Sequence, residues 1–272
     1  KRARSLGIPV LLGSATPSLE SMQHVRNGRY TGLRLDVRAG VSRKPRVNVI
    51  DARRQAMPDG LSPPLLDAIA RCLGRGEQAL VFRNRRGYAP VLLCHDCGWS
   101  ARCIQCESAL TLHGRSRLVC HHCGARHPAP VCCPDCGGLE IVPQGAGTER
   151  LEKALAEAFP DVPVIRVDRE TTTRATALAG HFEKLGEAAG ILVGTQMLAK
   201  GHDLARLTLV AIATVDESLF SADFRAPERL AQLLIQVSGR AGRSVHPGEV
   251  WLQTHHPDHP LLLTLLSGGY RA

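Results

Sequence analysis

The sequence has no long hydrophobic run and no export signal. Its apolar runs are all shorter than ten residues, whereas a helix that crosses a bilayer needs about 20 apolar residues. The first eight residues carry charge without the apolar stretch of a secretory signal. Internal repeats, low-complexity tracts and an initiating Met are also absent. We therefore expect a cytoplasmic chain with no membrane partner, and we interpret it as an internal piece of a longer protein.

The composition is that of a folded soluble protein with a basic N-terminal part. Hydrophobic residues make up 44% of the 272 residues and charged residues 22%, which argues against disorder. The net charge is +9, and residues 1–60 carry 12 Lys/Arg against 4 Asp/Glu. This stretch is either a solvated face or a strip that follows a phosphate backbone. Charge alone leaves both interpretations open.

Predicted strands and helices alternate along most of the chain. Apolar runs predict strands at 8–12, 47–50, 79–82, 162–167, 191–193, 207–213 and 248–253. Capping residues and helical periodicity predict helices at 17–27, 62–72, 174–185 and 227–238, and one that begins at 148. In the last of these, Leu151, Leu155 and Phe159 share one face, which we interpret as core. The alternation predicts an α/β fold with a parallel sheet covered on both faces.

Between residues 94 and 136, four Cys-x-x-Cys pairs interrupt this alternation. Each pair offers two thiolates from one tight turn, and two pairs complete a tetrahedral sulfur site for Zn²⁺. Four successive pairs argue against a redox dithiol, so we expect two zinc ions per chain. A nested pairing is favoured, because residues 107–119 then form a hairpin between the inner pairs, but sequential and interleaved pairings remain possible. The expected ligands are Cys94, Cys97, Cys103, Cys106, Cys120, Cys123, Cys133 and Cys136.

Two further points concern the cysteines. The segment contains four Arg and three Asp/Glu, so with thiolates and zinc its formal charge is about −3, which does not favour a phosphate clamp. The segment is either a platform that binds protein partners or a DNA end, or it has a purely structural role.

Cys72 falls in a predicted helix, where we expect a buried thiol.

Three strings outside the cysteine segment are typical of nucleotide-driven motors. Gly13-Ser14-Ala15-Thr16-Pro17 follows a predicted strand and offers small hydroxyl groups at its end. Gly194-Thr195-Gln196-Met197-Leu198-Ala199-Lys200-Gly201-His202-Asp203 follows another strand, where backbone N–H groups can bind phosphate. Gln236-Val237-Ser238-Gly239-Arg240-Ala241-Gly242-Arg243 ends a helix with two arginines at spacing three. A guanidinium fork of this kind neutralises charge on a transferred phosphoryl group.

In this order, the three strings resemble motifs III, V and VI of superfamily 2 helicases. The string from Val81 to Pro90, which leads directly into the first cysteine pair, narrows the resemblance to the replication-restart family of these DNA helicases. The family implies a RecA-like helicase lobe with a zinc-binding insertion, and it pairs the zinc ligands in the nested scheme. It divides this chain into the end of a first lobe (1–44), a second lobe (45–93 and 137–256), a two-zinc insertion (94–136) and the start of a C-terminal domain (257–272).

The resemblance also implies an activity and its residues. Members hydrolyse ATP with Mg²⁺, move 3′ to 5′ on forked or single-stranded DNA, and work with primosome proteins, the replicative helicase and single-stranded-DNA-binding protein. By position, Arg240 and Arg243 would contact the ATP phosphates with support from Gln236. The nucleotide loop would contain Gly201 and Asp203, Ser14 and Thr16 would couple hydrolysis to movement, and Arg85 and Arg86 would touch DNA.

The chain departs from the family in what it omits. It contains neither the Gly-x-x-x-x-Gly-Lys-Ser/Thr loop nor the Asp-Glu-x-His motif, since Asp216-Glu217 falls after motif V and is followed by Ser218. We therefore expect this chain alone to be inactive as an ATPase. The alternatives are another superfamily 2 translocase and a non-enzymatic zinc-ribbon binding module.

Overall fold

A computed structural model of the chain describes residues 2–35, 45–83, 92–114, 116–143, 148–167, 185–186, 188–195, 206–221, 223–241, 248–268 and 270. The chain separates into two compact units, residues 1–38 and residues 39–272. The domain boundaries that the sequence suggests at 44, 93, 136 and 256 stay predictions. Among the described residues, no helix combines the length and the apolar character that crossing a membrane requires.

The N-terminal unit contains two short helices, α1 (Arg2–Leu6) and α2 (Leu19–Arg26). Ser18 caps α2, because its side chain accepts a hydrogen bond from the backbone N–H of Ser21 at 3.2 Å. The predicted buried strand at 8–12 is wrong, since these residues have no regular structure and Leu11 is 84% exposed. A strand becomes buried only by pairing with other strands, and the described part of this unit contains none.

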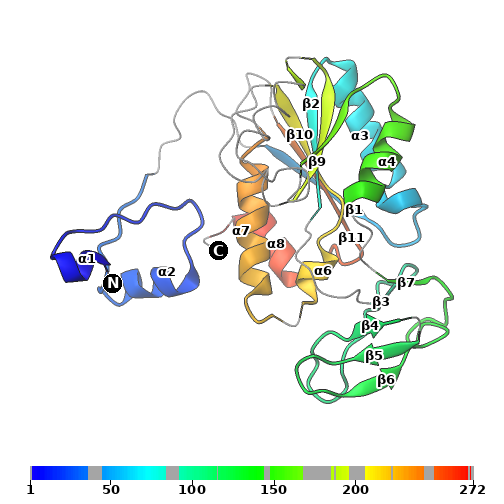
Figure 1. Cartoon of the computed structure of the whole chain (residues 1–272), viewed down its shortest axis with the longest axis horizontal. Helices are drawn as coiled ribbons and strands as arrows, with labels where there is room; N and C mark the ends of the chain where they lie inside the picture. The colour runs from blue at the N-terminus through cyan, green and yellow to red at the C-terminus, as the bar shows by residue number, and fades with distance from the viewer. Residues whose placement is uncertain are drawn as a thin grey trace. The chain divides into compact units, whose positions relative to one another are not determined.

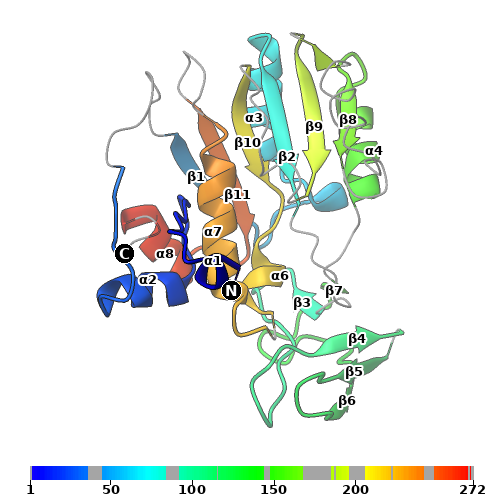
Figure 2. The ribbon, with the colours of Figure 1, turned by 60° about the vertical axis from the view of Figure 1, so that its left-hand side comes forward.

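Six parallel strands form the central sheet of the second unit, in the order β1-β11-β10-β2-β9-β8. This sheet is seen face-on in Figure 2. The bounds are Arg46–Asp51 for β1, Gln78–Phe82 for β2, Val164–Val167 for β8, Gly190–Gly194 for β9, Leu207–Ile212 for β10 and Glu249–Thr254 for β11. Each predicted strand of this unit is present, with ends that differ by a few residues from the apolar runs.

Helices cover both faces of the sheet (Figure 1). One face carries α3 (Pro63–Gly74) and α4 (Thr148–Ala158), and the other carries α7 (Ala226–Ser238) and α8 (Pro260–Gly268). Alternate residues of β2 divide between the two cores: Ala79 and Val81 pack with α3 and α4, whereas Leu80 and Phe82 pack with α7. The predicted α/β fold, with a parallel sheet covered on both faces, is thereby confirmed.

Of the other predictions of local structure, some are confirmed and one lies almost wholly outside the described residues. Leu151 and Leu155 are fully buried in the core and Phe159 is partly buried there, as their shared face predicts. Cys72 is buried as expected. The predicted helix at 174–185 lies almost wholly outside the described residues. A short 3-10 turn, η1 (Pro58–Gly60), and a short helix, α6 (Asp216–Leu219), complete the lobe.

The cysteine-rich segment is a small antiparallel insertion in this lobe. Strands β3 (Leu92–Cys94) and β7 (Ile141–Pro143) pair where the chain enters and leaves it. Strands β4 (Thr111–His113), β5 (Arg117–Val119) and β6 (Arg126–Pro128) form a three-stranded sheet. The pairing of β4 with β5 confirms the hairpin predicted within residues 107–119. The hydrophobic core of the insertion contains Leu92, Ala101, Leu110 and Leu118.

Candidate metal centres and the adjoining cavity

Each Cys-x-x-Cys pair forms the same tight turn. The residue after the second cysteine donates its backbone N–H to the carbonyl of the first cysteine, at 2.8–2.9 Å in all four turns. That residue adopts a positive φ each time: +83° at Gly98, +79° at Gly124, +73° at Gly137 and +59° at Glu107. Three of the four positions are glycine because it adopts this backbone region at little cost. The turns aim both sulfurs of a pair to the same side.

The eight sulfurs gather into two tetrads. Within each tetrad, all sulfur atoms lie within 4.8 Å of one another. Between pairs, sulfur–sulfur distances are 3.7 Å for Cys94–Cys136 and 3.6 Å for Cys97–Cys133 in the outer tetrad. In the inner tetrad they are 3.5 Å for both Cys103–Cys123 and Cys106–Cys120. The arrangement is the nested one, and Cys132 is exposed outside both tetrads.

The donor set fits zinc. Tetrahedral Zn²⁺ with Zn–S bonds of about 2.3 Å separates its sulfur ligands by about 3.8 Å. The sulfur–sulfur distances of both tetrads lie close to that value. Four thiolates without a nitrogen or oxygen ligand also form a closed coordination shell, which is typical of a structural site.

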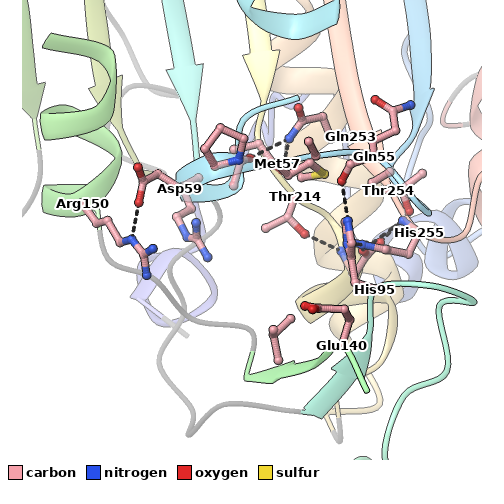
Figure 3. A pocket seen from close by; sticks show the side chains of 18 residues that line it. Gln55, Met57, Asp59, His95, Glu140, Arg150, Thr214, Gln253, Thr254 and His255 are labelled. Carbon is pink, nitrogen blue, oxygen red and sulfur yellow. Dashed lines mark hydrogen bonds and ion pairs between the residues drawn. The ribbon is translucent and has the colours of Figure 1, made fainter. Parts of the chain in front are cut away.

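A cavity of about 580 Å³ opens where the carboxyl ends of the strands meet the insertion. Its wall includes Arg83 after β2, Thr214 after β10, Thr254 at the end of β11, and His95 from the first cysteine turn. Figure 3 shows Thr214 and Thr254 of the lobe and His95 of the insertion at this cavity. Parallel α/β sheets bind ligands at this edge.

A chain of buried polar groups lines one side of this cavity. Asp216, at the start of α6, accepts hydrogen bonds from Thr254 Oγ1 at 2.5 Å, from the His255 backbone N–H at 3.1 Å and from His255 Nδ1 at 2.7 Å. The other nitrogen of His255, Nε2, lies 3.0 Å from His95 Nδ1 (Figure 3). Asp216 is therefore a buried hydrogen-bond partner of the residues at the end of β11. Through His255 and His95, this series of polar contacts connects the lobe to the insertion.

Two neighbouring histidines form the rest of this contact. Burial lowers the pKa of His256, whose ring packs edge-on against Phe220 with 4.4 Å between centroids. Burial, followed by the charge of Arg102, lowers the pKa of His259. Arg102 of the insertion lies over the Phe220 ring at 4.8 Å. The seam between the insertion and the lobe is thus built from aromatic contacts and neutral imidazoles.

The motor-like residues are described only in part. In the N-terminal unit, Thr16 is buried and its backbone N–H donates to Ser14 Oγ at 3.1 Å. Gln236 is exposed near the end of α7, and Arg240 is buried just beyond it. The other assigned residues, Arg85, Arg86, Gly201, Asp203 and Arg243, lie outside the described residues. The assignment of roles to all of these residues stays a prediction.

The sequence pattern did not reveal the series of contacts from Asp216 through His255 to His95. These contacts join residues that are 39 and 160 positions apart. The sequence does show His95 inside a cysteine turn and a cluster of His255, His256 and His259, but neither feature specifies a contact partner.

Comparison with known proteins identifies relatives over the whole chain. The chain is 54% identical over 272 residues to the replication restart protein PriA of Haemophilus influenzae, covering 99% of this chain and 37% of that protein. It is 42% identical to PriA of Bacillus subtilis (95% of this chain, 33% of that protein) and 38% identical to PriA of Chlamydia pneumoniae (97% and 36%). The chain therefore spans little more than a third of these relatives' length.

Other comparisons are less close. No family model matches the chain. Among solved structures, it is similar to S. cerevisiae Dbp5 bound to RNA and ADP BeF3, at 11% identity and a TM-score of 0.48, covering 98% of this chain and 51% of that one. The C-terminal part of the Fun30 ATPase domain aligns at 12% identity and a TM-score of 0.34, covering 69% of this chain and 40% of that one. On the evidence of the relatives that align over nearly all of its residues, this chain belongs to the PriA family of replication restart proteins.

Proposed function

We propose that this chain contributes to an ATP-dependent DNA helicase that restarts replication at stalled forks. In the proposed activity, the whole protein moves 3′ to 5′ on forked or single-stranded DNA and hydrolyses ATP with Mg²⁺. Its partners are primosome proteins, the replicative helicase and single-stranded-DNA-binding protein. The observation that carries this proposal is the 54% identity with a replication restart protein over 99% of this chain, together with the three motor-like strings.

The proposed ATP chemistry of this chain centres on its two arginines. Arg240 directly follows the last turn of α7, and its backbone N–H donates to the Val237 carbonyl at 2.9 Å, which extends the helix. Buried guanidinium groups bind phosphate oxygens in a fixed fork and stabilise charge in phosphoryl transfer. We further propose that Gln236 supports the two arginines, that Arg243 makes a second phosphate contact, and that Gly201 and Asp203 lie in the nucleotide loop. Ser14 and Thr16 would couple hydrolysis to movement, and Arg85 and Arg86 would contact DNA.

The full-length protein tests this assignment. We expect Arg240→Lys to lower the kcat of DNA-stimulated ATP hydrolysis by about 10³-fold or more, because a lysine keeps the charge but loses the fork. Arg229→Ala on the same helix is the matched control, since Arg229 pairs with Asp223 at the surface, and it should leave kcat within twofold. Wild-type turnover by the Arg240→Lys protein would refute the role of Arg240. The 272-residue chain alone should show no turnover.

We also propose that the two tetrads bind two zinc ions. Each closed tetrathiolate site would fix two cysteine turns, so that the insertion is a rigid platform on the lobe. Metal analysis of the purified chain should give two zincs, and Cys97→Ser and Cys106→Ser should each remove one and retain the other. Cys132→Ser is the matched control and should keep both, because Cys132 lies outside the tetrads. Loss of both metals from either single-site variant would contradict two independent sites.

The nucleic-acid partner needs a separate measurement. Strand displacement by the full-length protein on forked DNA and on an RNA duplex of the same sequence distinguishes a replication-restart helicase from an RNA translocase. We expect displacement of the DNA strand and none of the RNA strand. Displacement of the RNA duplex at a comparable rate would favour another superfamily 2 activity.

A further inference from the structure

The charged residues of the insertion separate into an acidic part and a basic part. The two stretches that carry the outer tetrad, 92–99 and 132–143, contain three Asp/Glu and no Lys or Arg. The stretch 108–131, which forms the three-stranded sheet, contains three Arg and no Asp or Glu. A zinc tetrathiolate carries a formal charge of about −2, which these three arginines exceed. The low net charge of the whole insertion therefore conceals a basic sheet at one end.

Strand register places two of these arginines on one face of the three-stranded sheet. In β5, Arg117 and Val119 point to the same side, because alternate residues of a strand share a face. Arg117 lies opposite His113 of β4, and Val119 lies opposite Arg126 of β6. Leu118 points the other way, into the core of the insertion, and is 3% exposed. The two arginines are therefore diagonal neighbours on the face that turns away from this core, which we call the outer face.

Both arginines of the outer face are available to a ligand. Their side chains are exposed, and no carboxylate among the described residues forms an ion pair with either of them. Pro128 and Val119 lie beside them on this face, together with His113, whose ring contacts that of His121. The third arginine of the stretch, Arg115, lies outside the described residues. The outer face thus combines two unpaired guanidinium groups with rings and apolar side chains.

The dimensions of the outer face suit a single strand of nucleic acid. Each of the three strands is three residues long, so the face extends about 10 Å along the strands and about 10 Å across them. That length corresponds to about three nucleotides at the rise of 3.4 Å per nucleotide of one strand. Figure 1 shows this sheet at the end of the insertion that lies away from the central sheet.

We propose that the outer face binds the sugar-phosphate backbone of single-stranded DNA. Arginine binds phosphate oxygens through a planar fork of donors and keeps its charge at all working pH values. Such contacts hold a strand in place without reading its sequence. Sites for single strands combine basic groups with rings and apolar side chains that contact the bases, and this face has both. The inference rests on the proposed DNA-dependent function, to which it adds a contact surface that needs no ATP hydrolysis.

The salt dependence of DNA binding tests this surface. Binding of an oligothymidylate to the zinc-loaded chain is measured by fluorescence anisotropy at about 50–200 mM salt, where each phosphate contact on a single strand contributes about −0.7 to the slope of log K against log salt. Arg117→Ala and Arg126→Ala should each lower the magnitude of this slope by about 0.7 and weaken binding about two- to fivefold. The double variant should lower it by about 1.4.

Two variants serve as controls. Arg117→Lys keeps the charge and should keep the wild-type slope. Lys153→Ala removes a cation from α4 that is 79% exposed and pairs with Glu157, and it should change neither the slope nor the affinity. Since the substituted side chains are exposed, all variants should retain two zincs and the wild-type melting temperature, which shows that any loss of binding is not a loss of folding.

Three results would overturn the proposal. The first is no binding of the oligothymidylate by the wild-type chain, and the second is an unchanged slope in the double variant. The third is binding of polyglutamate as tight as that of DNA and equally dependent on both arginines, which would assign the outer face to an acidic protein segment. An unchanged slope alongside normal strand displacement by the full-length protein rejects only this surface, whereas a reduced slope without any strand displacement by the wild type rejects only the helicase activity.

Discussion

The side chain of Gln253 connects three parts of the lobe, and its replacement by leucine should be strongly destabilising. Gln253 is 1% exposed. Its Oε1 accepts from the backbone N–H of Ser62 at 2.8 Å and from the Ser62 hydroxyl at 2.6 Å, and its Nε2 donates to the carbonyls of Ala213 at 2.8 Å and Gly60 at 2.9 Å. All four hydrogen bonds of the amide are thus made inside the protein, which joins β11 to the end of β10 and to the start of α3.

The magnitude follows from the groups that Gln253→Leu leaves unpaired. The Ser62 N–H and the Ala213 carbonyl are buried, and each such group costs about 1–3 kcal/mol without a partner. The Gly60 carbonyl belongs to a half-exposed residue that water can reach, and the Ser62 hydroxyl can rotate to another acceptor. The expected loss in the free energy of unfolding is therefore about 2–6 kcal/mol.

Urea unfolding of the zinc-loaded chain, followed by the fluorescence of Trp99 and Trp251, measures this loss. Ser62→Ala is the control, because it removes one hydroxyl donor while the Ser62 N–H keeps its bond to Gln253. It should cost about 1 kcal/mol. The reasoning is refuted if Gln253→Leu costs less than about 1 kcal/mol, or if Ser62→Ala costs as much as Gln253→Leu.

Three further predictions concern the cysteine turns and the buried thiol. Gly98→Ala should lower the melting temperature more than Gly124→Ala. Both residues have positive φ, but only at Gly98 would the new Cβ meet a backbone atom, the His255 carbonyl oxygen at 2.9 Å. Equal decreases in melting temperature would contradict this. Glu107→Gly should stabilise the chain by about 0.5–1 kcal/mol in thermal unfolding, since it relieves the one non-glycine turn at φ +59°, and a loss of stability would count against it. Burial raises the pKa of the Cys72 thiol from 9.0 to about 11, so the unfolded chain loses this proton first as pH rises. The stability advantage of the wild type over Cys72→Ala in urea unfolding should then fall by about 2 kcal/mol between pH 9 and 11, and an advantage independent of pH would contradict it.

The cysteine centres were predictable because their geometry is local. The spacing within each Cys-x-x-Cys pair sets the turn, and a glycine at the next position supplies its positive φ. The nested grouping was favoured because a hairpin fits between the inner pairs, and the family resemblance implied it, although other pairings were open from the residues alone. Glu107 marks the limit of this argument: the fourth turn keeps the same N–H to carbonyl bond, at 2.8 Å, without the glycine that signals it elsewhere.

The run at 8–12 and the histidine pair were not predictable because they depend on distant residues. Apolar residues such as Leu11 and Leu12 predict a buried strand, yet burial requires neighbouring strands that the described part of residues 2–35 does not contain. The contact of His95 with His255 joins positions 160 residues apart. Periodicity reports which face of an element is apolar, but it carries no information on which polar side chains from separate elements meet.

The position of the insertion has a consequence for the whole lobe. Its contacts reach three segments of the lobe: Arg102 lies over Phe220, just after α6, Gly98 approaches the backbone of His255, just after β11, and the carbonyl of His95 accepts from the Arg54 N–H, just after β1. Asp216 of α6 joins the first two of these segments through its hydrogen bonds to His255. Phe220 lies between α6 and α7, and α7 leads directly to Arg240. The insertion is therefore a structural part of the lobe's carboxyl edge.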